Sequence, residues 1–130
     1  MCDKASTRTA NLSLPRDQRG YLWDVLGAAE AIIEFTRGLD QAAYAASAIT
    51  HSAVERKFEI IGEALNLLNK ADPQIAAKIP ERFKIIAFRN LLAHGYAVVE
   101  HERVWDTAHN ELLTLRMAVL GILAELDTER

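Results

Sequence analysis

Apolar residues recur at steps of three and four along most of the chain, a spacing that predicts amphipathic helices. Three such stripes run through residues 22–36, 54–68 and 105–126. The stripe at 54–68 follows the narrow pattern of a helix that packs nearly antiparallel against its neighbours, and the stripe at 105–126 repeats its alternation of three and four. The alternation of apolar and polar residues that would indicate a strand is not evident. The pattern therefore predicts an all-α protein.

A fourth helix, expected from Pro80 to His94, has a different pattern. Its apolar residues cover nearly the whole circumference, and a helix of this kind is usually buried on most sides. We expect it to be the central helix of a bundle. Gly95 follows it, at the position where a glycine commonly ends a helix. The apolar residues are Phe83, Ile85, Ile86, Ala87, Phe88, Leu91, Leu92 and Ala93.

Capping residues and prolines indicate where the helices begin and end. Residues 13–15 read Ser-Leu-Pro and predict the start of the first helix, which Gly38 should end, and Thr50 is the expected cap of the next long helix. Residues 40–47 and 73–78 each suit a short helix. We therefore expect an up-and-down bundle of four main helices with one or two short ones.

Length and composition are those of one globular domain. Of the 130 residues, 50% are hydrophobic and 25% charged. Residues 1–13 are polar and lack a helical period, so we expect a flexible N-terminal tail followed by a single helical domain at 14–130. The single cysteine, Cys2, cannot form an internal disulfide, and no stretch approaches the roughly 20 apolar residues of a membrane span. We expect a cytoplasmic protein that does not enter membranes.

Charge is distributed unevenly along the chain. The net charge is -3, so no overall basic character indicates nucleic-acid binding. Residues 78–103 nevertheless hold five basic residues against three acidic ones. Glu55, Glu59 and Glu63 form a row of like charge opposite the apolar stripe of their helix. The row is either a solvated face relieved by Arg56 and Lys57 or a recognition face for a basic partner.

The side chains best suited to chemistry are Arg89, Asn90, His94 and Tyr96, which lie around the end of the apolar helix. Charged groups are rarely buried without a partner. Arg89 carries a permanent charge on a planar fork that matches phosphate oxygens. His94 would lie in the last turn, where the helix dipole favours positive charge, and imidazole is the common acid–base group near neutral pH.

Arg89 and His94 point in different directions on an ideal helix, about 140° apart at about 100° per residue. They can meet if Arg89 uses its length, if the last turn is distorted, or if a second copy of the chain supplies one of them. The third alternative implies a homodimer with the motif at its interface.

An arginine with an imidazole suits cleavage of an RNA phosphodiester without a metal. A base takes the 2′-hydroxyl proton, an acid protonates the leaving 5′-oxygen, and the guanidinium stabilises the phosphate. The alternative is structural: Arg89 pairs with a buried carboxylate, Asn90 caps a neighbouring helix, and His94 and Tyr96 close the helix end. Residue types alone leave both open.

Arg89, His94 and Tyr96 read R-x4-H-x-Y, which resembles the signature of the HepT-like proteins of the HEPN superfamily. Residues 53–64 are similar to the third-helix segment of that family, and residues 21–26 to its first. The resemblance covers roughly residues 16–126.

The resemblance implies a HEPN-like bundle that forms a homodimer, with the motifs of both subunits facing a shared cleft. Similar proteins are metal-independent RNases and act as toxins, each paired with an MNT-type nucleotidyltransferase antitoxin. Carried over, Arg89 and His94 are catalytic, Asn90 supports them, and Tyr96 is the residue that the antitoxin adenylylates. No cofactor and no metal ligand are implied. A non-catalytic partner that presents Tyr96 to the nucleotidyltransferase is the alternative.

The remaining histidines carry less weight in the sequence. His101 and His109 would lie about 12 Å apart along a helix, too far to share a metal. His51 falls near a helix start and is expected to be exposed.

Overall fold

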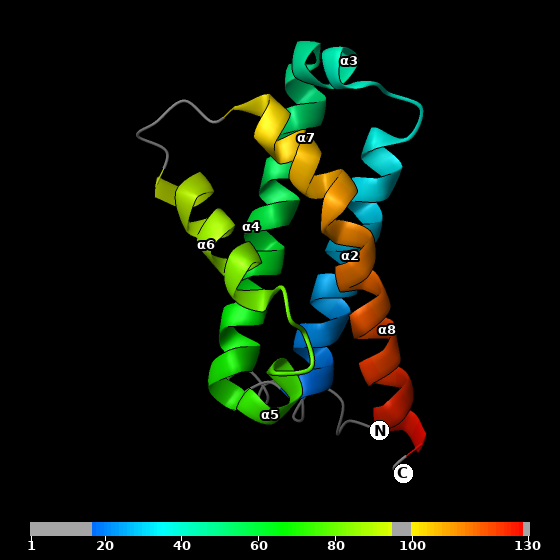
Figure 1. Ribbon diagram of the computed structural model, residues 1–130, viewed down its shortest axis with the longest axis vertical. Helices are drawn as coiled ribbons and strands as arrows, with labels where there is room; N and C mark the ends of the chain where they lie inside the picture. Colours follow the sequence, from blue (N-terminus) through cyan, green and yellow to red (C-terminus); the bar gives the residue numbers. More distant parts are fainter. Residues whose placement is uncertain (1–16, 95–99, 129–130) are drawn as a thin grey trace, which may run out of the picture.

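The computed structural model describes residues 17–94 and 100–128, and these form seven helices. The all-α bundle predicted from the sequence is confirmed (Figure 1). The helices are α2 (Gln18–Thr36), α3 (Gln41–Ala46), α4 (Ala48–Ala71), α5 (Pro73–Ala76), α6 (Arg82–His94), α7 (His101–Asn110) and α8 (Leu112–Thr128). None of the described helices is long and apolar enough to cross a lipid bilayer.

Local chemistry accounts for most helix ends. Asp17, Asp40, Ser47 and Asp72 cap α2, α3, α4 and α5 by accepting a backbone N–H of the first turn. Gly38 follows α2 with φ 77°, a left-handed conformation that glycine adopts without strain. The expected stop there and both expected short helices are confirmed. The cap of α4 is Ser47 rather than Thr50, and residues 13–15 lie outside the described residues.

The long helix α4 is the centre of the molecule. It packs against α2 on one side and α6 on the other, and it also contacts α3 and α5, while α8 packs on α2. Its stripe from Val54 to Leu68 is fully buried, as its spacing predicts. The core of α4 consists of Val54, Phe58, Ile61, Gly62, Ala64, Leu65 and Leu68.

The expectation that α6 is the central helix is wrong. Figure 1 places α6 at the edge of the bundle, against α4, and only Ile85, Phe88 and Leu92 are buried along it. Phe83 is 58% exposed and Leu91 39%. The apolar residues do surround α6, but no described element covers its outer side.

The expected single helix through residues 105–126 is also wrong, because the chain forms α7 and α8 with Glu111 between them. In the turn before this break, two side chains bond to backbone carbonyls: Thr107 Oγ1 donates to Arg103 O at 2.8 Å, and His109 Nδ1 lies 2.9 Å from Trp105 O. Such bonds compete with the helical ladder and bend helices.

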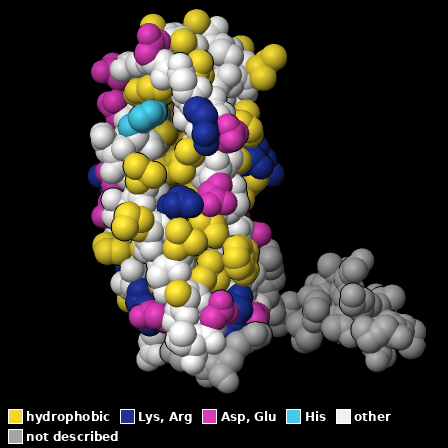
Figure 2. Space-filling model, turned by 90° about the vertical axis from the view of Figure 1, so that its right-hand side faces the viewer, with side chains coloured by type: hydrophobic (Ala, Val, Ile, Leu, Met, Phe, Trp, Pro, Cys, Tyr) yellow, Lys and Arg dark blue, Asp and Glu magenta, His cyan; other side chains and the backbone are white. Residues whose placement is uncertain are grey.

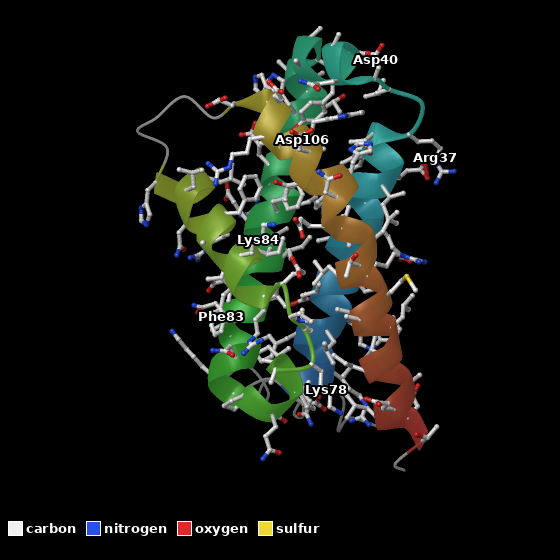
Figure 3. The ribbon with its side chains drawn as sticks, viewed as in Figure 1. Arg37, Asp40, Lys78, Phe83, Lys84 and Asp106 are labelled. Atoms are coloured by element: carbon white, nitrogen blue, oxygen red, sulfur yellow. The ribbon has the colours of Figure 1, made fainter. Side chains whose placement is uncertain are left out.

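An ion pair fastens α6 to the junction of α7 and α8. Lys84 Nζ donates to Glu111 Oε1 at 2.6 Å (Figure 3). The hydrogen bond from Lys84 holds the pKa of the Glu111 carboxyl below its ordinary value, and the carboxylate raises the pKa of Lys84. This contact supplements the packing of α6 on α4.

The helices α4 and α6 come into close contact at Gly62. A Cβ at this position would overlap Arg89 Cβ and lie 2.6 Å from Arg89 Cγ. Glycine therefore lets the two backbones come close where Arg89 leaves α6. We infer that this contact sets the position of the arginine relative to α4.

We expect Gly62→Ala to lower the free energy of unfolding by about 1–3 kcal/mol, because the added methyl overpacks the helix contact. Gly121→Ala is the matched control, since a Cβ at Gly121 meets nothing within 4 Å on the exposed side of α8. Alanine loses less conformational entropy on folding than glycine, so Gly121→Ala should raise the free energy of unfolding by up to about 1 kcal/mol. Urea unfolding followed by circular dichroism measures both. Equal effects of the two substitutions would contradict the close contact.

Candidate active site

A surface hollow of about 320 Å³ lies where α2, α4 and α6 meet, and Arg89 forms part of its wall. Arg89 and Ala93 contribute from α6, four residues apart and therefore on one face of the helix. Tyr21 and Asp24 contribute from α2. The rest of the lining comes from α4: Arg56, Glu59, Ile60, Glu63, Ala64 and Leu67.

Two oxygens hold the guanidinium of Arg89. One terminal nitrogen donates to Glu63 Oε1 across the contact between α4 and α6, and the other donates to Asn90 Oδ1 at 2.8 Å. The Arg89 side chain is 27% exposed and that of Glu63 is 46% exposed, so solvent still reaches the pair. Since a guanidinium has five N–H donors, these contacts orient Arg89 and leave donors for another acceptor.

Glu63 is a site residue that the sequence reasoning did not identify. The sequence feature that could have identified Glu63 is the glutamate row. Each member of this row has a basic partner in the same chain. Glu63 pairs with Arg89, Glu59 Oε1 lies 3.4 Å from Arg56 Nη1, and Glu55 lies between two imidazoles. The row is thus largely engaged within the molecule, which removes most of the basis for a recognition face.

Charge in the hollow does not favour an anion. Asp24, Glu59 and Glu63 contribute carboxylates against the guanidinium groups of Arg56 and Arg89. A phosphate that approached Arg89 in a single chain would meet these carboxylates as well. The hollow therefore holds and orients the arginine more than it attracts a polyanion.

His94 lies apart from this hollow. It is the last residue of α6 and is exposed, and the hollow includes its neighbour Ala93 instead. Asn90, also exposed, bonds to Arg89 rather than capping another helix. Within the described residues of one chain, the structure does not bring Arg89 and His94 together. Gly95 and Tyr96 lie outside the described residues.

His94 shares its side of α6 with exposed apolar residues. Ala87, Asn90, Leu91 and His94 are all exposed and follow one another at steps of three and one along one face of the helix. Phe83, one turn before Ala87, extends this face (Figure 3). We call the five residues the outer face of α6.

One group of described residues has metal-ligand geometry, and it lies outside the hollow. His51, Glu55 and His101 have ligand atoms within 4.8 Å of one another. Glu55 precedes Glu63 by two helical turns, about 12 Å along α4. The expectation that His51 is exposed is wrong, because its side chain is only 18% exposed. Long-range pairing of His51 with His101 leaves no trace in the local sequence pattern.

Curated proteins of similar sequence are named as ribonucleases. The chain is 32% identical over 113 residues to "Putative RNase MJ0125" of Methanocaldococcus jannaschii, covering 86% of this chain and 96% of that protein. It is 28% identical over 104 residues to "Putative RNase MJ1380" of the same organism, covering 80% of this chain and 94% of that protein. "Probable ribonuclease HepT" of Thermococcus cleftensis is 31% identical over 103 residues, 79% of this chain and 93% of that protein.

No solved structure is significantly similar to the chain. The family described as "Ribonuclease HepT-like" matches residues 25–121, which include α4, α6 and the R-x4-H-x-Y motif. Together with the helical bundle, this match shows that the chain belongs to the HepT-like ribonuclease family of the HEPN superfamily.

Proposed function

We propose that the protein is a metal-independent endoribonuclease that acts as the toxin of a toxin–antitoxin pair. Membership of the HepT-like ribonuclease family and the ribonuclease names of its relatives support the activity. The observation that carries the proposal is an arginine held by Glu63 and Asn90 on the same helix as an exposed histidine.

Cleavage needs Arg89 and His94 close to one phosphate. The imidazole acts as the acid–base group of the 2′-hydroxyl attack, and the guanidinium stabilises the charge that develops on the phosphate. Attack by the 2′-oxygen breaks the bond to the 5′-oxygen, leaving a 2′,3′-cyclic phosphate and a 5′-hydroxyl. These residues supply both proton transfer and charge stabilisation, so the proposed reaction uses no metal.

The separation of Arg89 from His94 supports a homodimer whose sites combine both subunits. The outer face of α6 exposes Phe83, Ala87 and Leu91, and an uncovered apolar face is typical of an interface. A second copy on this face would bring its His94 toward a cleft shared by the two subunits, and this cleft is the proposed binding site for RNA. The partner's arginines would also offset the carboxylates of the hollow.

A second apolar surface competes with this one as the dimer interface. Figure 2 shows hydrophobic side chains along the face formed by α2 and α8, interrupted by charged side chains. Met117 is 71% exposed and Leu113 56%. A dimer formed there would leave both outer faces of α6 uncovered, so the two interfaces make different predictions.

The proposed antitoxin is an MNT-type nucleotidyltransferase that adenylylates Tyr96. This tyrosine follows His94 by two residues in the sequence. An added nucleotide would bring bulk and negative charge next to the proposed site, where an RNA phosphate has to bind. Modification would then inhibit cleavage by steric exclusion and by repulsion.

A second candidate function is a non-catalytic partner that presents Tyr96 to the nucleotidyltransferase. The pairing of Arg89 with Glu63 favours it, because the carboxylate already neutralises the guanidinium. This candidate predicts modification of Tyr96 without RNA cleavage.

We expect the purified protein to cleave single-stranded RNA in the presence of EDTA. His94→Ala should lower the rate by about 10²–10⁴-fold, the usual contribution of a general acid or base. Arg89→Lys should lower it by about 10²-fold, because an ammonium cannot reproduce the guanidinium fork. Gel assays of end-labelled RNA, with the 2′,3′-cyclic phosphate detected by mass spectrometry, measure both rates.

His109→Ala is the control for that experiment, since His109 is an exposed histidine on α7 that bonds to a backbone oxygen of its own helix. It should cleave RNA like the wild type. Intact RNA across a range of substrates would favour the non-catalytic partner, and full activity of His94→Ala would exclude the assigned role.

Mixed dimers test whether a site combines two subunits. We expect a heterodimer of Arg89→Lys with His94→Ala, purified through two different tags, to recover about half of wild-type activity, because one of its two sites has both residues. Both homodimers should cleave at least about 10²-fold more slowly than the wild type. If Arg89 and His94 of the same subunit act together, the heterodimer contains no complete site and remains inactive.

Solution mass identifies the interface. Leu91→Glu should convert the dimer into monomers, because it places a charge at the centre of the outer face of α6. Met117→Glu is the matched substitution on the face of α2 and α8 and should leave the dimer intact. The opposite result would move the interface to α8 and remove the shared site.

Intact mass tests the modification. Co-expression with a nucleotidyltransferase encoded beside its gene should add one or more adenylyl groups to the protein, and Tyr96→Phe should abolish the increment. The modified protein should cleave RNA at a reduced rate. An increment that persists in Tyr96→Phe would place the modification on another residue.

A further inference from the structure

Two histidines and a glutamate meet at one end of the bundle. Figure 1 shows α3, the start of α4 and the start of α7 coming together there. His51 and Glu55 are four residues apart on α4, so their side chains share one face. His101 is the first residue of α7. Glu55 Oε2 lies 3.7 Å from His51 Nδ1 and 3.8 Å from His101 Nδ1.

The polar atoms of this cluster lack hydrogen-bond partners. His51 Nδ1, His101 Nδ1 and the Tyr44 hydroxyl are all buried atoms without one. Buried polar atoms are satisfied in the great majority of cases, so three in one place call for an explanation. Tyr44 itself is fully buried, and its ring meets both imidazoles edge-on at centroid distances of 6.2 and 6.3 Å.

We propose that His51, Glu55 and His101 bind one divalent transition-metal ion, of which Zn²⁺ is the reference case. Ligand atoms about 2.0–2.1 Å from a tetrahedral ion lie about 3.3–3.4 Å from one another. The distances from Glu55 Oε2 to the two imidazole nitrogens exceed this by a few tenths of an ångström. All three ligand atoms lie within 4.8 Å of one another, so side-chain rotations have to draw them together by at most about 1.5 Å to reach one ion.

The donor set selects the class of metal. Two imidazole nitrogens with one carboxylate oxygen suit zinc and its neighbours in the first transition row, whereas magnesium and calcium prefer oxygen ligands throughout. The two rings stack with centroids 3.9 Å apart and planes inclined by 28°, and this arrangement presents both Nδ1 atoms to the same carboxylate. Three protein ligands leave one position for water.

Tyr44 is placed to support the carboxylate rather than to replace it. Burial, and to a lesser degree the charge of Glu55, raises the pKa of the Tyr44 hydroxyl well above its ordinary value. Its hydroxyl has no hydrogen-bond partner in the described residues. The small rotations that bring the ligand atoms together would let it donate to the ligating carboxylate, since metal-bound carboxylates are generally hydrogen-bonded.

The ion would connect parts of the chain that are distant in sequence. It joins α4 to the first residue of α7, which follows Tyr96 by five positions. Glu63, which holds the proposed catalytic Arg89, lies about 12 Å from Glu55 along α4. The ion stabilises this end of the bundle and takes no part in the proposed reaction.

Calorimetry of the untagged 130-residue chain tests the site. The protein carries Cys2→Ser to remove the thiol, is treated with EDTA and dialysed, and is then titrated with ZnCl₂. We expect saturable binding of one Zn²⁺ per chain, a higher melting temperature with Zn²⁺, and no response to MgCl₂. Co²⁺ should give the visible absorption of a four-coordinate nitrogen and oxygen site. Absence of saturable binding would overturn the proposal.

Variants assign the ligands. His51→Ala and His101→Ala should each weaken Zn²⁺ binding at least tenfold, while His109→Ala should bind like its parent. Equal binding by all three would overturn the proposal. Imidazole NMR of the unsubstituted chain gives the same answer without a change of fold, since Zn²⁺ should shift the signals of two of the four histidines. If a proton on one imidazole holds the cluster together instead, the imidazole signals should change with pH and not with Zn²⁺, and the proposal would be overturned. None of these measurements depends on RNA cleavage.

Discussion

The close contact of α4 with α6 at Gly62 is the constraint on which the candidate site depends. The contact is possible because Gly62 has no side chain at the point where Arg89 leaves α6. At this separation Glu63, the next residue on α4, reaches the guanidinium across the interface. Packing and charge pairing thus act at the same place, and together they determine where the arginine points.

The position of α6 at the edge of the bundle determines both how the helix is attached and which of its residues are exposed. The helix is buried only through Ile85, Phe88 and Leu92, and polar contacts supplement this packing: Arg82 with Asn69, Lys84 with Glu111 and Arg89 with Glu63. Its outer side stays apolar and exposed, with His94 at the end. A helix built in this way is incomplete as a core element, which is the property expected of one half of an interface.

Periodicity was enough to predict that the chain is helical and which stripe of α4 is buried, because burial of a helix face repeats at three and four residues. It could not predict which helix is central. The apolar circumference of α6 is the same whether a neighbouring helix or a second chain covers it. Likewise, the end near residue 110 depends on side chains that bond to backbone carbonyls, and no local stop residue marks it.

Some residues of the candidate site could likewise be predicted from the sequence, and others could not. Arg89, Asn90 and His94 could be chosen because polar residues are conspicuous in an apolar helix. Glu63 and the pair of His51 with His101 could not, because their partners lie 26 and 50 positions away in the chain. Only the folded structure shows that each member of the glutamate row has its own partner. Glu63 pairs with Arg89 of α6, and Glu59 pairs with Arg56 of its own helix. Glu55 lies between the imidazoles of His51 and His101.

The pairing of Arg89 with Glu63 has a further consequence for any polyanion that binds at this arginine. An arginine that neutralises a phosphate of a nucleic acid releases cations condensed on the polyanion, and this release makes binding strongly dependent on salt. Here the Glu63 carboxylate is attached to the protein and stays beside the guanidinium when a phosphate binds. The pair of Arg89 with Glu63 therefore neutralises less of the charge of the polyanion and releases fewer cations, so Arg89 contributes less to the salt dependence than a solvated arginine would.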